Sequence, residues 1–432
     1  MKSRNTQRDC LLITALFTGL LLNLPAWSAV PPTGKVPDQY IVTLDKGVDP
    51  ASVANEMAAQ HGLGIRHVYR HAIKGFAARI PAGRLKVLAR DPRVVAVTAD
   101  EFVHLNKKCA TPPCSGGGGG GEDPAPPPAG PAQVTPFGVL RIQGDLSSTV
   151  AGNGSGAVDV DVAVIDTGIM SGHSDLNVVG GINCSKGRAD KYDDGNGHGT
   201  HVAGTIAALD NSIGVVGVAP GARLWAVRVL NNAGSGFTSD VICGIDWVTA
   251  NADTIEVANM SLGGSGTDTG CAGHPQHQAI CNSVAAGVTY VVAAGNDTED
   301  AANHVPASYD EVITVSALAD FNGEAGGGAA ATCRSDVDDT FANFSNYGPD
   351  VDIIAPGVCI ESTWNDGGLY TISGTSMASP HVAGAAALYK ATYPSASPDV
   401  VKAALVGAGN DNWNNSDDGD VVKEPMLDVT GF

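Results

Sequence analysis

The strongest constraint on the fold is a series of almost wholly apolar segments that begins near residue 138. Residues 160–165 read Val-Asp-Val-Ala-Val-Ile, the pattern of a strand covered on both faces of a parallel sheet. Similar segments recur along the chain, with helical patterns between or after them; the strands are at 224–230, 257–262, 289–294 and 312–317, the helices at 201–209, 239–249 and 379–392. This alternation predicts an α/β domain with a doubly wound, mostly parallel sheet, whose functional side chains follow the carboxyl ends of strands.

The first 29 residues have the composition of a secretion signal. A basic start is followed by an apolar run at 11–24 that ends at Pro25, and small residues at 28 and 29 offer a cleavage point. The run is shorter than the roughly 20 residues of a membrane-spanning helix. We therefore expect residues 1–29 to be removed and the protein to be secreted and extracellular, with no membrane contact afterwards. The alternative is that this segment is not cleaved and anchors the protein in the membrane.

Residues 36–106 have the pattern of a separate small α+β module. Strand-like segments at 40–44, 75–80 and 94–98 alternate with helical ones at 51–61 and 84–90. Residues 107–136 then form a linker with six consecutive glycines and a proline-rich run, a composition that cannot bury a core. The remainder, 137–432, is the large domain.

Charge is unevenly distributed between these parts. The chain has a formal net charge of −20, which argues against nucleic acid as a partner. From 133 to the end there are 35 Asp and Glu against 10 Lys and Arg, whereas 37–105 has 7 against 9. The acidic body and the mildly basic module are therefore able to attract each other, although solubility alone would also explain the acidic surface. We expect a monomer.

The chain has nine cysteines. Cys10 lies in the predicted signal, and an even number remains in a chain expected to be exported, which predicts disulfides. No CxxC pair is present, so zinc is poorly supported. Sequence does not determine the pairing; the favoured pairs, in falling order, are Cys271 with Cys281 and Cys109 with Cys114, then Cys333 with Cys359, then Cys184 with Cys243.

Three segments of the large domain carry residues suited to nucleophilic catalysis. Asp166 comes directly after the strand at 160–165, His198 stands at a helix start, and Ser376 enters a helix. A serine nucleophile needs a base to take its proton and a carboxylate to fix the tautomer of that base. A serine at a helix N-terminus also presents its own backbone N–H to a developing oxyanion. The segments therefore predict an Asp-His-Ser triad.

In this order the segments resemble the signature motifs of the subtilisin-like serine proteases, from about residue 133 to about 407. The run at 194–201, Asp-Gly-Asn-Gly-His-Gly-Thr-His, is most similar to proteinase K-like extracellular bacterial enzymes. The resemblance implies a serine endopeptidase in which Asp166 orients His198, His198 is general base and acid, and Ser376 forms the acyl-enzyme. It also implies that Asn296 donates its amide to the oxyanion.

Two further histidines are expected to be structural. A metal pair of His201 with His198 is one interpretation, but a buried packing role is the better one, and the same holds for His381.

The resemblance also implies a substrate cleft that pairs with an extended peptide through its backbone. Its two edges would be Gly234-Ser235-Gly236 and Ser261-Leu262-Gly263. Backbone pairing tolerates many sequences, so protein and peptide substrates should be cut with broad specificity, with apolar or aromatic residues preferred before the cut. Asp297 beside the asparagine would admit basic residues, unless it is only a solvated rim charge.

The front module resembles the inhibitory propeptides of this family, so the protein is expected to be an autoprocessed zymogen with an intramolecular inhibitor. The module's tail, 102–106, would fill the cleft like a product. The long linker leaves two positions open for the mature N-terminus, near Asn106 or further toward Ala132.

Calcium is the cofactor that the resemblance implies. In proteinase K-like enzymes an aspartate and two backbone carbonyls hold it, and the matching positions are Asp352 with the carbonyls of Asp310 and Val312. A second candidate is the acidic stretch 411–420, which would otherwise be a solvated loop.

Two rival functions differ in class. An inactive homologue that acts as a binding or structural protein is disfavoured by the intact triad and asparagine. A lipase or esterase of the α/β-hydrolase class is disfavoured because its order is serine, acid, histidine.

Overall fold

The computed structural model describes residues 34–105, 132–415 and 418–432. The predicted signal peptide, most of the predicted linker and the pair Cys109–Cys114 lie outside the described residues. Within the described part, no helix is both long and apolar enough to cross a bilayer.

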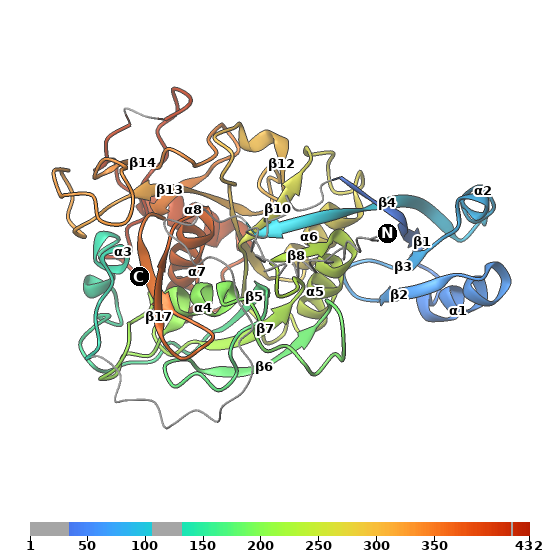
Figure 1. Cartoon of the computed structure of the whole chain (residues 1–432), viewed down its shortest axis with the longest axis horizontal. Coiled ribbons are helices and arrows are strands. Elements are labelled where there is room, and N and C mark those ends of the chain that lie inside the picture. The colour runs from blue at the N-terminus through green and yellow to red at the C-terminus, as the bar shows by residue number, and fades with distance from the viewer. Residues whose placement is uncertain (1–33, 106–131, 416–417) are drawn as a thin grey trace, which may run out of the picture. The chain divides into compact units, whose positions relative to one another are not determined.

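In the described residues, the large domain is built on an eight-stranded sheet with the order β14-β13-β11-β9-β5-β7-β6, and β15 pairs with β13 beside this path (Figure 1). Every pair is parallel except β13 with β14. The strands are β5 (Asp161–Asp166), β6 (Val178–Asn183), β7 (Arg223–Arg228), β9 (Val257–Met260), β11 (Thr289–Ala293), β13 (Ile313–Ala319), β14 (Thr340–Phe341) and β15 (Ile353–Pro356). The predicted doubly wound, mostly parallel sheet is confirmed.

Alternate residues of the central strand enter two separate hydrophobic cores. Val162 and Val164 of β5 pack with α4 (His198–Ala207) and α7 (Thr375–Thr392). Ala163 and Ile165 pack on the opposite face with α5 (Thr238–Ala250) and α6 (Pro275–Ala285). Both faces of the sheet are therefore covered, which explains why residues 162–165 of this strand are all apolar, with Asp161 and Asp166 only at its ends.

Helices α4 and α7 begin three and four residues earlier than the apolar periodicity predicts, at 198 and 375. The small and polar residues of their first turns carry no periodic signal. Because of these early starts, His198 and Ser376 lie in the first turns of their helices.

Several elements had no clear sequence signal. They are helices α3 (Phe137–Arg141), α6 and α8 (Pro398–Ala408), the single turns η2 (Gly144–Leu146) and η3 (Ala301–Asn303), and the hairpin of β16 (Ile360–Thr363) and β17 (Leu369–Ile372).

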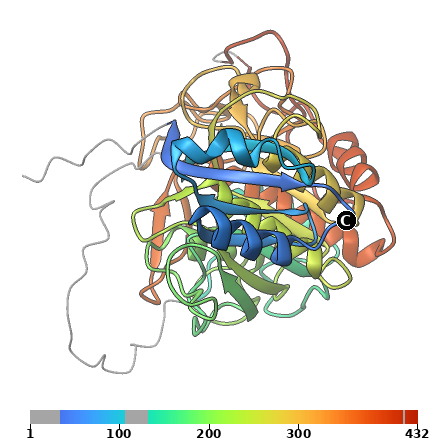
Figure 2. The same ribbon diagram turned by 90° about the vertical axis from the view of Figure 1, so that its right-hand side faces the viewer.

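The front module is an antiparallel sheet with the order β4-β1-β3-β2 and two helices. Its elements are β1 (Lys35–Leu44), α1 (Pro50–His61), β2 (Gly64–Tyr69), β3 (Gly75–Arg79), η1 (Ala82–Arg84), α2 (Leu85–Leu88) and β4 (Val94–Leu105). Val42 and Phe76 of the sheet pack with Val53 and Met57 of α1 in a core of the module's own. Figure 2 shows the two blue helices on the outer face of the module. The predicted small α+β fold is confirmed, with β2 as an additional strand.

Strand β4 is longer than the predicted segment and links the module to the large domain. Its first part pairs with β1, and its last residues pair with β8 (Ser235–Phe237) and β10 (Leu262–Ser265), which in turn pairs with β12 (His304–Val305). On its inner face the module contributes Ile41, Tyr69 and Ala77 to the core that contains α5. The module is therefore packed directly against the large domain.

Three disulfides are present among the described residues: Cys184–Cys243, Cys271–Cys281 and Cys333–Cys359. All three pairings were among those favoured from sequence, including the one considered weakest.

Candidate active site

Asp166 and His198 meet in the buried interior at the carboxyl end of β5. His198 Nδ1 lies 2.9 and 3.0 Å from the two carboxylate oxygens of Asp166. Both side chains are fully buried. Gly199 permits this approach, since a Cβ at that position would lie 2.1 Å from the carbonyl oxygen of Gly168. The carboxylate thus places the proton on Nδ1, and Nε2 has no hydrogen-bond partner among the described residues.

Ser376 and Asn296 come together at the start of α7. Ser376 Oγ donates to the carbonyl of Ser261 at 3.2 Å. The side-chain oxygen of Asn296 accepts from the backbone N–H and the hydroxyl of Thr375, at 2.9 and 3.1 Å. These bonds fix the plane of the Asn296 amide. Its NH₂ group is buried and has no hydrogen-bond partner within the described residues, so it is able to donate to a further acceptor.

Asp194 organises the loop before His198, a role that sequence reasoning missed. One carboxylate oxygen accepts from Thr167 Oγ1 and from two backbone N–H groups, those of Asn196 and Gly197. The other accepts from the N–H and hydroxyl of Thr200. Asp194 is thus a positioning residue, because it connects the segment after Asp166 to both sides of His198.

The two additional histidines are packed away from solvent and stay neutral. His201 Nε2 lies 3.0 Å from the carbonyl of Ile360 and 3.1 Å from that of Tyr370, which ties α4 to the β16–β17 hairpin. His381 Nδ1 contacts the carbonyl of Met377 at 2.8 Å. Burial lowers the pKa of His201 to about 3 and that of His381 to about 4, which fits structural roles.

The tail of the front module lies between the two predicted cleft edges. His104 pairs with Ser235 on one side and Gly263 on the other, and Val103 pairs with Gly236. Leu105 pairs with Leu262. The Leu105 N–H also donates to the carbonyl of Gly234 at 3.1 Å. All six predicted cleft residues thus lie on or next to the strands that hold an extended peptide.

Two carboxylates of α5 hold the module in place, and neither was predicted. Asp246 accepts from the backbone N–H groups of Arg70, His71 and Ala72 at 2.6 to 3.1 Å. Asp240 is paired with the guanidinium of Arg66 and with His67; the three contacts are 2.6 to 2.8 Å.

The module also contributes one carboxylate that forms hydrogen bonds with the same helix. Asp100 of β4 accepts from the backbone N–H of Ser239, in the first turn of α5, at 2.9 Å, and from its hydroxyl at 2.5 Å. A carboxylate at a helix N-terminus is favoured by the helix dipole. The only sequence signal for these contacts was the charge contrast between module and body.

The residues predicted to hold calcium do not fit the ion as they stand. Asp352 and the carbonyls of Asp310 and Val312 do converge, but on the ammonium of Lys402, whose Nζ lies 2.8, 3.1 and 2.7 Å from them. A cation of the chain itself therefore stands where the resemblance implied a metal.

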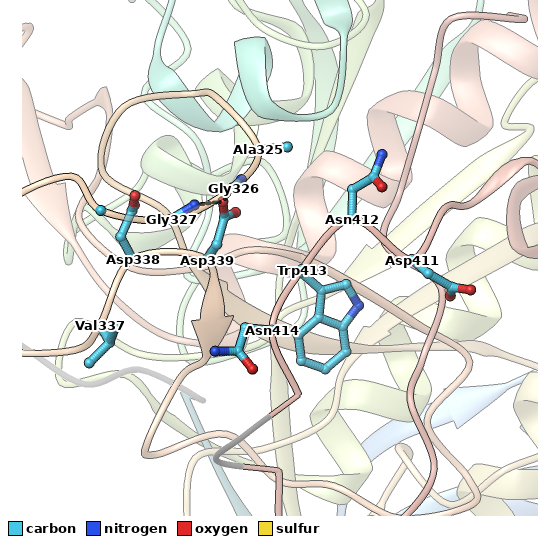
Figure 3. A pocket seen from close by; sticks show the side chains of 11 residues that line it. Ala325, Gly326, Gly327, Val337, Asp338, Asp339, Asp411, Asn412, Trp413 and Asn414 are labelled. Atoms are coloured by element: carbon cyan, nitrogen blue, oxygen red, sulfur yellow. Dashed lines mark hydrogen bonds between the residues drawn. The ribbon is translucent and has the colours of Figure 1, made fainter.

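The acidic stretch 411–420 divides into two parts. Figure 3 shows a pocket lined by Asp411 together with Asp338 and Asp339. Asp339 already accepts from the N–H groups of Gly326 and Gly327, at 2.6 and 2.8 Å, so the pocket offers few free carboxylate oxygens.

Further along the stretch, buried oxygens lack partners among the described residues. They belong to Asn415, Asp418 and the nearby Glu424, in which both carboxylate oxygens are unpartnered. Residues 416 and 417 lie outside the described residues. Burial raises the pKa of Glu424 to about 8.

A further oxygen-rich group, missed from sequence, surrounds Asp175. This carboxylate is 2% exposed and accepts from the amide of Asn211 at 2.7 Å and the N–H of Val215 at 3.1 Å. Gln133 Oε1 accepts from the N–H of Asn211 at 2.7 Å. Burial raises the pKa of Asp175 to about 6. One amide side chain and a backbone N–H thus contact a buried carboxylate that no side-chain cation of the described residues pairs with.

One other group of metal-binding residue types, Cys271, Cys281, His277 and Glu311, lies within the described residues. The two cysteines form a disulfide, so they offer no thiolate.

A buried Asp-His pair, a serine in the first turn of a helix and a fixed asparagine amide are the groups that a serine hydrolase requires. A peptide strand held between β8 and β10 is what a peptidase would bind. The subtilase family profile matches residues 158–421, and the peptidase inhibitor I9 profile matches residues 39–106.

Proteins of similar sequence align with most of this chain. Subtilisin NAT from Bacillus subtilis subsp. natto is 35% identical over 389 residues, 88% of this chain and 87% of that protein. Subtilisin DY from Bacillus licheniformis is 42% identical over 277 residues, 63% and 91% of the two chains. The crystal structure of a cold adapted subtilisin-like serine proteinase has a TM-score of 0.55 and 36% identity, covering 68% of this chain and 98% of that one.

This chain belongs to the subtilase family. It is a serine-type endopeptidase whose catalytic domain follows a propeptide of the I9 inhibitor type, the organisation of a zymogen.

Proposed function

We propose that the protein is a secreted endopeptidase that cleaves its own propeptide and uses Asp166, His198 and Ser376 as its triad. The observation that carries this proposal is the chain's own tail, which extends between β8 and β10 in a domain that also holds the buried Asp166–His198 pair and Ser376 in the first turn of α7. The relatives are subtilisins, which fits export of the protein with 1–29 as its signal.

In the proposed reaction, His198 Nε2 takes the hydroxyl proton of Ser376 as Oγ attacks the scissile carbonyl. Asp166 stabilises the imidazolium that forms. The oxyanion receives hydrogen bonds from Asn296 Nδ2 and from the backbone N–H of Ser376. His198 then returns the proton to the leaving amine, and a water molecule hydrolyses the acyl-enzyme by the same steps.

The register of β4 supports a cut after Asn106. Leu105, the last residue of the tail that the structure describes, is held on both sides, by Gly234 and Leu262, and Asn106 is the next residue in the sequence. Later trimming toward Ala132 would remove the remaining linker.

The same pairing supports broad specificity. Most contacts to the tail come from backbone atoms, while Val103 is 3% exposed and packs in the apolar core beneath the cleft. We therefore propose that substrates are extended peptides with apolar side chains at alternate positions. Asp297 has a side chain that is 60% exposed, which fits a rim charge open to basic side chains.

The propeptide is proposed to inhibit the enzyme until it is degraded. Its tail occupies the cleft, while Asp240 and Asp246 hold its sheet against α5. Release would require all of these contacts to be lost, so inhibition should persist after the first cut.

Calcium binds subtilisins in general. We propose that this chain holds it mainly in the loop of Asp175, Asn211 and Gln133, where a buried carboxylate without a cationic partner lies close to the amide group of Asn211. Asn415, Asp418 and Glu424 are proposed as a second site, since their buried oxygens lack partners among the described residues. Bound calcium would supply structural stability and no catalytic step.

A fluorophosphonate probe separates this proposal from an inactive homologue. The mature enzyme should be labelled on Ser376, and His198→Ala should abolish rapid labelling because the serine loses its base. Ser155→Ala, a change at an exposed serine, is the matched control and should label normally. Absence of labelling in the correctly folded wild type would favour a binding role.

A further inference from the structure

Lys402 lies on α8, at the edge of the sheet where β13 begins. The helix is anchored by Val401 and Leu405, which are fully buried. Between these two anchors, Lys402 reaches back to the segment 310–312 and to Asp352, just before β15.

The ammonium group of Lys402 has one hydrogen-bond acceptor for each of its three hydrogens. Nζ lies 2.8 Å from Asp352 Oδ1 and 2.7 and 3.1 Å from the carbonyls of Val312 and Asp310. An ammonium has three donors and no acceptor, so these contacts use its whole hydrogen-bonding capacity.

Asp352 uses both of its carboxylate oxygens. The other oxygen of Asp352 accepts the backbone N–H of Thr314 at 2.9 Å. Burial raises the pKa of Asp352, and the charge of Lys402 acts against that rise. The side chains of Lys402 and Asp352 are only 27% and 20% exposed, so the pair is partly shielded from competing water and salt.

A calcium ion would not share this place. Calcium requires six to eight oxygens at about 2.3–2.6 Å, and the ammonium occupies the point on which these oxygens converge. A divalent ion beside it would meet a like charge at close range.

We propose that Lys402 is a built-in cation that replaces a metal at this site. The chain therefore carries its own charge where the resemblance implied calcium, and this part of the fold is stable without any ion. A second consequence follows: removing only the ammonium should leave an oxygen cradle that accepts calcium.

The test counts bound calcium in the full chain, in a Ser376→Ala background that prevents self-cleavage. Isothermal titration with CaCl₂ is compared for this parent, for Lys402→Met and for Lys402→Met with Asp352→Asn. Met keeps the apolar stem and removes the charge. We expect one additional calcium per chain in Lys402→Met, a melting temperature that rises with calcium more than that of the parent, and loss of both in the double variant.

Lys390→Met is the matched control. Lys390 Nζ also donates to two carbonyls, those of Pro394 and Ala396, at 2.8 and 2.9 Å, but it forms no salt bridge with a carboxylate of the described residues. It should gain no calcium. Calcium bound at other sites is common to all variants and cancels in the comparison.

Equal calcium counts in the parent and in Lys402→Met would overturn the proposal. Asp352→Asn alone gives an independent test if Lys402→Met does not fold. In the parent background it should leave the calcium count unchanged, and loss of one calcium would show that the ion displaces the lysine.

Discussion

The contact between Asp246 and the propeptide should control the strength of self-inhibition. Its carboxylate accepts the N–H groups of three consecutive residues, Arg70 to Ala72. Hydrogen bonds to a charged group contribute about 1.5–3 kcal/mol each, against about 1 kcal/mol for neutral ones. Asp246→Asn removes the charge and one acceptor, so we expect a loss of about 3 kcal/mol, on the order of a 100-fold rise in the inhibition constant.

The assay adds residues 30–106 to mature enzyme and measures inhibition of peptide hydrolysis. Asp246 lies on α5, which carries none of the predicted triad residues, so hydrolysis without the propeptide should be unchanged. Asp253→Asn removes the same charge from an exposed position after α5 and is the control for net charge. An inhibition constant that changes less than about threefold in Asp246→Asn, or equally in both variants, would refute the reasoning about specific hydrogen bonds.

Three other outcomes are expected. Asn296→Ala should lower kcat by about 10²–10³-fold with little change in KM; an effect confined to KM in steady-state assays would argue against an oxyanion role. Asp194→Asn should lower the free energy of unfolding by about 2–4 kcal/mol and reduce kcat more than it raises KM; unchanged urea denaturation would contradict its positioning role. EDTA should lower the melting temperature of the Ser376→Ala protein, and Asp175→Asn should remove most of that calcium effect; identical melting with EDTA and excess calcium would rule out a stabilising site.

Sequence predicted the fold well where one local pattern determines one element. Residues 162–165 of β5 are all apolar because both faces of the strand are buried, and the apolar pattern in the sequence reflects this burial. The apolar periodicity alone placed the starts of α4 and α7 too late, because His198 and Ser376 stand among small and polar residues, and only the motifs placed these two residues at helix starts.

Most contacts between residues far apart in the sequence could not be predicted from the sequence. Nothing in the local sequence of Asp246 indicates that it accepts three N–H groups of the propeptide, and only the charge contrast suggested an association. The three oxygens around Asp352 were located through family resemblance, but Lys402 lies 50 residues further on in a helix that gave no distinct signal. Its ammonium enters the site because Val401 and Leu405 fix the rotation of α8, a packing result that requires the three-dimensional structure.

The most direct test of the account is self-processing of the purified full-length chain. After incubation, intact mass and N-terminal sequencing should show a cut after Asn106 in the wild type and in Ser155→Ala. The Ser376→Ala chain should remain joined from the propeptide to the catalytic domain. Processing of Ser376→Ala at the wild-type position and rate, in a preparation free of other proteases, would contradict the assignment of Ser376 as the nucleophile.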